Sequence, residues 1–284
     1  MKISIAPSAG FCFGVKRAID MAVYSAGKFG TELNTIGPII HNPQVVCLLE
    51  EKGIFPVESV DKIRSDTIII RSHGIKAGIA DEIAKKDIAV IDATCPFVKK
   101  AQDYMKSASS EGYFIIMVGD KKHPEVQSII SFAVAGRYMV LNNLEELKHV
   151  DFTEKIALIS QTTQDVMFYL SVIYEVFRRV KKGVIVFNTI CDATKLKQEE
   201  AAVLAARSDV MIVVGGYNSA NTNKLKNICK SIQDRTYHVE TEKELDPGWF
   251  RDAENVGITA GASTPDWIIK KVVEKIKVIE KQNK

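Results

Sequence analysis

Residues 88–102 read IAVIDATCPFVKKAQ, and this stretch contains the pattern from which the fold can be predicted. A short β-branched run at residues 88–91 leads to Cys95, and a segment with apolar residues at helical spacing begins at Pro96. β-Branched residues favour strands, and proline is common at the first position of a helix. The stretch therefore predicts a strand that ends near a cysteine, with a helix directly after it.

The same alternation of strand-like and helix-like segments runs along the whole chain. Strand-like runs stand at residues 2–6, 66–70, 88–91, 113–118, 155–159, 183–187, 209–214 and 255–258. Helical segments are expected at 43–52, 96–111, 164–182, 192–207, 221–233 and 265–281, in addition to an apolar stripe over 15–26. Most of the strand-like runs are too apolar for a sheet with one wet face. The pattern predicts an α/β protein with mainly parallel sheets and helices on both faces.

Two further cysteines repeat the pattern of Cys95. Cys12 stands in AGFCFGVKRAI (residues 9–19) and Cys191 in NTICDATKLKQEEA (residues 188–201). The intervals between the three cysteines are 83 and 96 residues. This spacing suggests three small α/β domains, residues 1–94, 95–190 and 191–284, that meet around one site to which each contributes a cysteine.

Composition narrows the class of protein. With 46% hydrophobic and 26% charged residues in 284, the chain can form a sizeable core. Its 38 Lys and Arg against 35 Asp and Glu give a formal charge of +3, too small to indicate a nucleic-acid or membrane partner, although a small anionic substrate remains compatible. No apolar run suits a signal peptide or a membrane helix, so we expect a cytoplasmic protein. Five cysteines are too few for a disulfide scaffold and favour thiols or metal ligands.

Cys12, Cys95 and Cys191 are candidate thiolates, because the N-terminus of a helix lowers the pKa of a thiol. A cysteine at the boundary of an element can also be incidental. Three thiolates would suit zinc with a histidine as the fourth ligand, or an iron–sulfur cluster with one iron open. Cys47 and Cys229 fall in the middle of helical segments among apolar neighbours, so we expect both in the core.

Polar residues also gather where strands are predicted to end. His41, His73 and His123 suit a pocket for a phosphate or diphosphate, or are loop and capping residues, whereas His149 and His238 lack this context and are expected to be structural or exposed. Glu125 either compensates a helix dipole or donates a proton if burial raises its pKa. Further polar residues at predicted strand ends could either contact a substrate or cap the following helices. They are Gln161, Thr162, Thr163, Ser219, Asn221, Ser263 and Thr264.

Nine segments, in order, resemble those of the LytB family, the 4-hydroxy-3-methylbut-2-enyl diphosphate reductases of the non-mevalonate isoprenoid pathway. The segments are GFCFGVKRAI, HNP, SHG, DATCP, HPEV, SQTT, CDAT, GGYNSANTNKL and TAGASTPD. The resemblance covers about residues 3–275, nearly the whole chain. One departure is Ala220, which stands where many members have a serine, so that only its backbone N–H can serve the substrate.

The resemblance implies a trefoil of three α/β domains with a pseudo-three-fold arrangement around a central cavity. It implies a 4Fe-4S cluster on Cys12, Cys95 and Cys191, with the fourth iron open to an allylic diphosphate substrate, and a ferredoxin or flavodoxin type of electron donor. The reaction would remove the hydroxyl of the substrate as water, with two electrons and two protons, and yield isopentenyl and dimethylallyl diphosphate. By the same resemblance, Glu125 donates the proton, Thr162 binds the substrate hydroxyl and helps relay the proton, and His123 lies close to that path. The implied diphosphate-binding set is His41, His73, His123, Ser219, Ala220, Asn221 and Ser263.

Two other classes of function fit part of the pattern. A zinc enzyme acting on a phosphorylated small molecule explains the three thiols but leaves three histidines and several hydroxyls unassigned. A non-catalytic iron–sulfur electron carrier would normally close its cluster with four protein ligands, whereas three suitable cysteines are found. The iron and sulfide content of the protein separates these alternatives.

Overall fold

The computed structural model describes residues 1–30 and 32–282 and confirms the α/β class. Within those residues the strands form three sheets of four parallel strands each. In spatial order, sheet A contains β1 (Lys2–Ile5), β12 (Asn255–Ala260), β10 (Val210–Val214) and β11 (Thr236–Val239). Sheet B contains β3 (Ile54–Val57), β2 (Leu33–Ile36), β4 (Thr67–Ile70) and β5 (Ala89–Asp92). Sheet C contains β7 (Tyr138–Leu141), β6 (Phe114–Val118), β8 (Ile156–Ser160) and β9 (Val184–Val186).

The three sheets share one strand order, which explains the cysteine repeat. In sheets B and C the strands follow the order second, first, third, fourth along the chain, and sheet A has the same order if β1 is counted as its fourth strand. Each fourth strand, β1, β5 or β9, leads to one of Cys12, Cys95 and Cys191, and a long helix starts at the next residue. The sequence repeat therefore corresponds to a repeat of topology.

Helices connect the strands, as parallel pairing requires. They are α1 (Phe13–Phe29), α2 (Pro43–Glu50), α3 (Ala77–Ala84), α4 (Pro96–Ser110), α5 (Pro124–Ile130), α6 (Val166–Arg179), α7 (Asp192–Ala205), α8 (Ala220–Ile232) and α9 (Asp266–Gln282). Short 3₁₀ turns stand at Val60–Lys62, Leu144–His149, Glu242–Glu244 and Pro247–Phe250. Among the described helices, none combines the length and apolar character that crossing a membrane requires.

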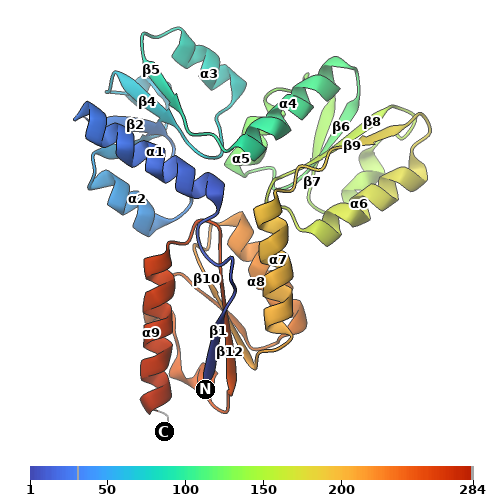
Figure 1. The fold of residues 1–284 in the computed structure, drawn as a ribbon. Coiled ribbons are helices and arrows are strands. Elements are labelled where there is room, and N and C mark those ends of the chain that lie inside the picture. The colour runs from blue at the N-terminus through green and yellow to red at the C-terminus, as the bar shows by residue number, and fades with distance from the viewer. Residues whose placement is uncertain (31, 283–284) are drawn as a thin grey trace. The chain divides into compact units, whose positions relative to one another are not determined.

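Alternation along the central strands places a core on each face of a sheet. In β10 the even-numbered Val210, Ile212 and Val214 pack with α9, while Met211 and Val213 pack with α7 and α8. Figure 1 shows α9 on one side of sheet A and α7 with α8 on the other. Sheet C is built in the same way, with α6 on one face and α4 and α5 on the opposite face. Burial on both faces accounts for the nearly continuous apolar runs of the sequence.

The chain divides into two compact units. Unit 1 contains Met1–Lys16, Ile40–Leu48 and Asp192–Lys284, and unit 2 contains Arg17–Ile39 and Leu49–Cys191. Sheet A belongs to unit 1, whereas sheets B and C belong to unit 2. The division into residues 1–94, 95–190 and 191–284 stays a prediction, and residues 31, 283 and 284 of it lie outside the described residues. One observation departs from it, because β1 pairs with β12 instead of joining sheet B.

Candidate active site

Every predicted site residue follows the C-terminal end of a parallel strand or begins the helix after it, as expected. In unit 2 these are His73 after β4, Cys95 after β5, His123 and Glu125 after β6, Thr162 after β8 and Cys191 after β9. In unit 1 they are Cys12 after β1, His41 before α2, Ser219, Ala220 and Asn221 after β10, and Ser263 after β12. Ligands bind at this edge in open α/β sheets.

In unit 2 the structure brings Glu125 and Thr162 into direct contact. The backbone N–H of Thr162 donates to Glu125 Oε1 at 2.6 Å, and Thr162 Oγ1 donates to Glu125 Oε2 at 2.9 Å. Glu125 is only 3% exposed, and burial raises the pKa of its carboxyl to about 7, although both hydrogen bonds from Thr162 act in the opposite direction. A carboxyl with this pKa can exist in either protonation state near neutral pH, which suits a proton donor.

Two histidines stand next to this pair. His123 is the N-cap of α5, and its Nδ1 accepts a hydrogen bond from the backbone N–H of Glu125 at 3.2 Å. The His73 ring meets the His123 ring edge to face, with centroids 5.3 Å apart. Capping orients the His123 ring. The capping role and the site role expected for His123 are therefore compatible.

The two cysteines of unit 2 are tied by their backbones to the same group of loops. The Cys95 N–H donates to the Ser72 carbonyl at 2.9 Å, directly before His73, and the Cys191 N–H donates to the Thr162 carbonyl at 3.1 Å. Both side chains are half-buried, and neither cysteine is in a disulfide. Cys95 is the N-cap of α4 but makes no capping bond through its side chain. Its Sγ is therefore not used by the helix.

In unit 1 three loops of sheet A meet. The Cys12 N–H donates to the Ala262 carbonyl at 3.1 Å, next to Ser263, and Ser263 Oγ donates to the His41 carbonyl at 3.5 Å. Gly215 follows β10 with a φ of +146°. A Cβ there would lie 2.6 Å from Thr264 Oγ1, so the close approach of the two loops requires glycine.

The start of α8 contains a helix cap, Ser219, and a buried side-chain amide that lacks hydrogen-bond partners among the described residues, Asn221. Ser219 caps the helix, since its Oγ accepts from the Thr222 N–H at 3.3 Å. Asn221 is 4% exposed, and neither its Oδ1 nor its Nδ2 has a hydrogen-bond partner among the described residues. Buried amides are nearly always paired, so an orphaned one indicates a missing ligand or water.

Sequence reasoning missed one pair of residues on α7. Lys197 is 2% exposed, and its Nζ donates to the carbonyl oxygens of Ser8 and Gly10, the latter at 2.8 Å. Glu200, one turn further along, accepts from the Ser8 N–H at 2.7 Å. The two charged side chains hold the loop that leads to Cys12. A signal was available, because Lys197 shares the apolar helical face of Thr194, Ala201 and Ala205, where a lysine needs a buried partner.

The residues expected outside the site divide into one correction and three confirmations. Cys229 is buried and the pKa of its thiol is raised to about 12 by burial, whereas Cys47, which we expected in the core, is exposed. The Cys47 prediction failed because α2 turns Val45 and Leu49 inward and Cys47 outward. His149 is exposed, and the His238 ring is half-buried, with Nε2 2.7 Å from the Gly215 carbonyl.

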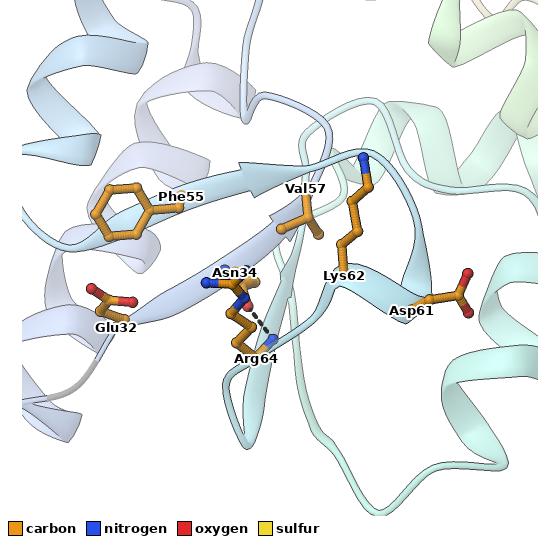
Figure 2. Close-up of a pocket in the computed structure, with 7 residues that line it drawn as sticks. All are labelled: Glu32, Asn34, Phe55, Val57, Asp61, Lys62 and Arg64. Atoms are coloured by element: carbon orange, nitrogen blue, oxygen red, sulfur yellow. Dashed lines mark hydrogen bonds between the residues drawn. The ribbon is translucent and has the colours of Figure 1, made fainter.

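A cavity of about 520 Å³ in unit 2 lies apart from these residues. Figure 2 shows it beside β2, β3 and the turn Val60–Lys62, where the Asn34 Oδ1 accepts from the Arg64 N–H at 2.8 Å. Its lining residues are Glu32, Asn34, Phe55, Val57, Asp61, Lys62 and Arg64. They include none of the predicted site residues, so this cavity is not part of the candidate site.

Comparison with known proteins gives consistent matches over the full length of the chain. The LytB protein family model matches residues 3–277. The 4-hydroxy-3-methylbut-2-enyl diphosphate reductase of Syntrophotalea carbinolica is 50% identical over 99% of the chain and all of the relative. That of Geobacter sulfurreducens is 48% identical over the full length of both chains.

Solved structures give the same result. One of (E)-4-hydroxy-3-methyl-but-2-enyl diphosphate reductase, described as the terminal enzyme of the non-mevalonate pathway, is 46% identical with a TM-score of 0.71, covering 97% of this chain and 99% of the other. The reductase of Plasmodium falciparum is 26% identical with a TM-score of 0.90, covering 96% and 86%.

Proposed function

Because the chain belongs to the LytB family, we propose that it reduces 4-hydroxy-3-methylbut-2-enyl diphosphate. The reaction takes up two electrons and two protons, breaks the C–O bond of the allylic alcohol, and releases water with isopentenyl or dimethylallyl diphosphate. The observation that carries this proposal at the site is the buried Glu125–Thr162 pair, which sits beside Cys191 and two histidines in unit 2. An oxidoreductase that protonates its substrate needs such a donor.

Cys12, Cys95 and Cys191 are the residues that would hold the cluster. The chemistry of this donor set fits, because each is a half-buried thiol directly before a long helix, and none is in a disulfide. The other two cysteines fit poorly, since Cys229 is buried with a raised pKa and Cys47 is exposed in the middle of a helix. When bound, a 4Fe-4S cluster with three cysteine ligands supplies electrons and an open iron that acts as a Lewis acid.

Glu125 and Thr162 would deliver the proton to the leaving oxygen. The Glu125 carboxyl holds the proton, and Thr162 Oγ1, 2.9 Å from Glu125 Oε2, both contacts the carboxyl and can turn its hydroxyl towards a substrate oxygen. The Thr162 N–H fixes the other carboxyl oxygen at 2.6 Å. Holding Glu125 at both oxygens keeps the proton on one defined path. His123, which caps α5 and is held there by the Glu125 N–H, would lie close to this path.

The diphosphate would bind at the polar ends of the strands. In unit 1, the unpartnered amide of Asn221, the Ser263 hydroxyl and the N-terminal amides of α8, including that of Ala220, supply donors to an anion. His41, His73 and His123 complete the set that we propose. Ser219 caps α8 with the oxygen of its hydroxyl, which leaves the hydroxyl hydrogen available to a phosphate oxygen.

The electrons would come from a ferredoxin or flavodoxin type of donor. The proposed location is the cytoplasm, where thiols are kept reduced. The test is the iron and acid-labile sulfide content of protein purified without oxygen, followed by turnover with a chemical reductant. We expect about three to four iron with matching sulfide per chain and release of the two five-carbon diphosphates. About one zinc without sulfide would refute the cluster, and a loaded cluster without turnover would leave only an electron carrier.

A further inference from the structure

The loop between β10 and α8, residues 215–219, leads directly to the proposed diphosphate-binding residues at the start of α8. Its first two residues are glycines, and Gly215 has a φ of +146°. Glycine loses more backbone freedom on folding than any other residue, so a loop of this composition needs contacts that hold it in one conformation. The structure supplies such contacts at Gly215 and at Tyr217.

Side chains of residues 238–244, which comprise the end of β11 and the turn after it, hold this loop. His238 Nε2 donates to the Gly215 carbonyl at 2.7 Å, since a carbonyl oxygen can only accept. Glu240 Oε1 accepts from the Tyr217 N–H at 2.7 Å, and Glu244 Oε2 accepts from the Tyr217 hydroxyl. The hydrogen bond to Glu244 raises the pKa of Tyr217 to about 12, so its hydroxyl keeps the proton that it donates. The backbone and the side chain of Tyr217 are therefore bound to one segment.

Gly216 connects this arrangement to the His41 segment within unit 1. A Cβ on Gly216 would lie 3.1 Å from the His41 carbonyl oxygen and 3.6 Å from Glu240 Oε1, so the glycine backbone fits between the two. The same carbonyl accepts from Ser263 Oγ at 3.5 Å. The position of the loop therefore affects its contact with two other members of the proposed diphosphate-binding set.

The loop is also joined to the first turn of α8. The Tyr217 carbonyl accepts from Asn223 Nδ2 at 2.7 Å, and Ser219 caps the helix. Between them Asn221 is 4% exposed, and its amide has no hydrogen-bond partner among the described residues. The direction in which this amide and the N-terminal amides of α8 present their donors thus depends on where Tyr217 is held.

We propose that Tyr217, held by Glu240 and Glu244, is a positioning residue that sets the geometry of the diphosphate-binding loop. The inference rests on the proposed function, because it takes the start of α8 as a binding site for the diphosphate. Tyr217 acts through Asn221 and the amides of α8, so loosening it weakens the binding of substrate. The proton donor Glu125 lies in the other unit and is unaffected. A preorganised loop binds more tightly because less freedom is lost on binding.

Steady-state kinetics and pyrophosphate calorimetry of Tyr217→Phe test this role. Phenylalanine keeps the ring, which lies 4.6 Å from the His238 ring between centroids, but removes the hydroxyl that donates to Glu244. We expect the KM for the allylic diphosphate and the Kd of inorganic pyrophosphate each to rise at least about threefold, with kcat and iron content within about twofold of the parent. The matched control, Tyr24→Phe, changes a tyrosine that is 72% exposed on α1 and should alter neither constant. An unchanged Kd, or a fall in kcat at constant KM, would overturn the proposal.

Glu240 separates the effect of the hydrogen bond from that of the charge. Glu240→Gln keeps an oxygen that can accept from the Tyr217 N–H, whereas Glu240→Ala removes it. We expect Glu240→Ala to weaken pyrophosphate binding at least about threefold and Glu240→Gln to preserve it. Loss of a carboxylate by itself favours an anion nearby, so weaker binding in Glu240→Ala reports the lost hydrogen bond. Equal changes in the two variants would contradict the proposal. If the parent protein binds pyrophosphate but does not turn over the allylic diphosphate, the proposed function is refuted, while the Glu240 variants still decide the role of the loop.

Discussion

The Glu125 carboxyl is the group whose chemistry depends most on its surroundings. Replacing it by glutamine keeps the shape of the side chain and an acceptor for the Thr162 N–H but removes the transferable proton. We expect Glu125→Gln to retain its iron content and visible spectrum while its kcat falls at least about a hundredfold. Steady-state turnover with excess reductant measures the loss. Turnover equal to that of the parent protein would remove Glu125 from the proton path.

Burial of Glu125 also makes stability depend on pH. Its pKa of about 7 in the folded protein lies above the ordinary value of 4.5, so between these values the folded state binds more protons than the unfolded state. The contribution of this residue to stability is therefore complete below about pH 4.5 and is lost as the pH rises through about 7. We expect Glu125→Gln to unfold at a higher temperature than the parent protein at pH 8, with a smaller difference at pH 5. Thermal scans at both pH values decide this.

The side-chain amide of Asn221 is buried without a hydrogen-bond partner among the described residues, so the free-energy cost of its desolvation is not offset in the ligand-free protein. Leucine has a similar size and no polar atoms, so Asn221→Leu should leave the ligand-free protein equally or more stable. Binding of inorganic pyrophosphate, measured by calorimetry, should weaken at least about tenfold if Asn221 serves the diphosphate. Unchanged pyrophosphate binding would show that the Asn221 amide does not bind the diphosphate.

The two classes of cysteine differ by their positions on helices. Cys12, Cys95 and Cys191 precede α1, α4 and α7, while Cys47 and Cys229 lie within α2 and α8. We expect Cys47→Ser and Cys229→Ser to keep the full iron content and a serine at any of the other three positions to lower it. In the native holoprotein, maleimide should modify Cys47 and spare Cys229, whose thiol is buried with a pKa of about 12. Iron loss in a folded Cys47 or Cys229 variant would contradict the ligand assignment.

Two side chains of α7 hold the loop that leads to Cys12, one of the three proposed cluster ligands. Lys197 and Glu200 hold Ser8 and Gly10 by three hydrogen bonds, two residues before Cys12. Methionine fills much of the space of lysine without its charge, so Lys197→Met should stay folded but free the loop and lower the iron retained per chain. Iron content after gel filtration measures the effect, and Lys195→Met is the control, since Lys195 on the same helix is half-buried and, among the described residues, forms its ion pair with Asp192 at 3.2 Å. Full retention in Lys197→Met would limit the lysine to a structural role.

The elements that sequence reasoning missed were those whose local signal is weak. The strands β3, β7 and β11 are edge strands of four residues each, and β3 includes Pro56, which cannot donate to a ladder. The central strand β2 was missed as well, because it has only four residues and two of them, Asn34 and Thr35, are polar. The other central strands were predictable because burial on both faces makes them apolar, and the long helices because their apolar residues recur at helical spacing. In the site, residue types at strand ends identified Glu125 and Thr162, but only packing shows their contact and the raised pKa. Ser219 suits both a helix cap and a substrate contact, so the sequence alone leaves both roles open. The structure shows the cap, in which its Oγ accepts from the Thr222 N–H.

For the whole chain, local patterns predicted the repeat but not the sheet that its first strand joins. The strand before Cys12 has the same pattern as those before Cys95 and Cys191, a short β-branched run that leads to a cysteine and then a helix. It nevertheless pairs with β12, more than 250 residues later, and its side chains Met1 and Ile3 join the core of sheet A. The terminal amine of Met1 also forms a 2.8 Å ion pair with Glu280 on α9. A pairing over that distance leaves no local trace.

The pairing of β1 with β12 predicts which parts of the chain fold alone. Residues 95–190 contain all of sheet C and every residue of its two cores, so this fragment should unfold cooperatively. Residues 191–284 lack β1, which leaves β12 as an unpaired edge and opens the core at Ile3. We expect the second fragment to be poorly structured until a peptide of residues 1–12 is added, with the gain followed by circular dichroism. Cooperative folding of residues 191–284 without the peptide would mean that β1 contributes little, because the remaining three strands with α7, α8 and α9 would then bury enough apolar surface by themselves.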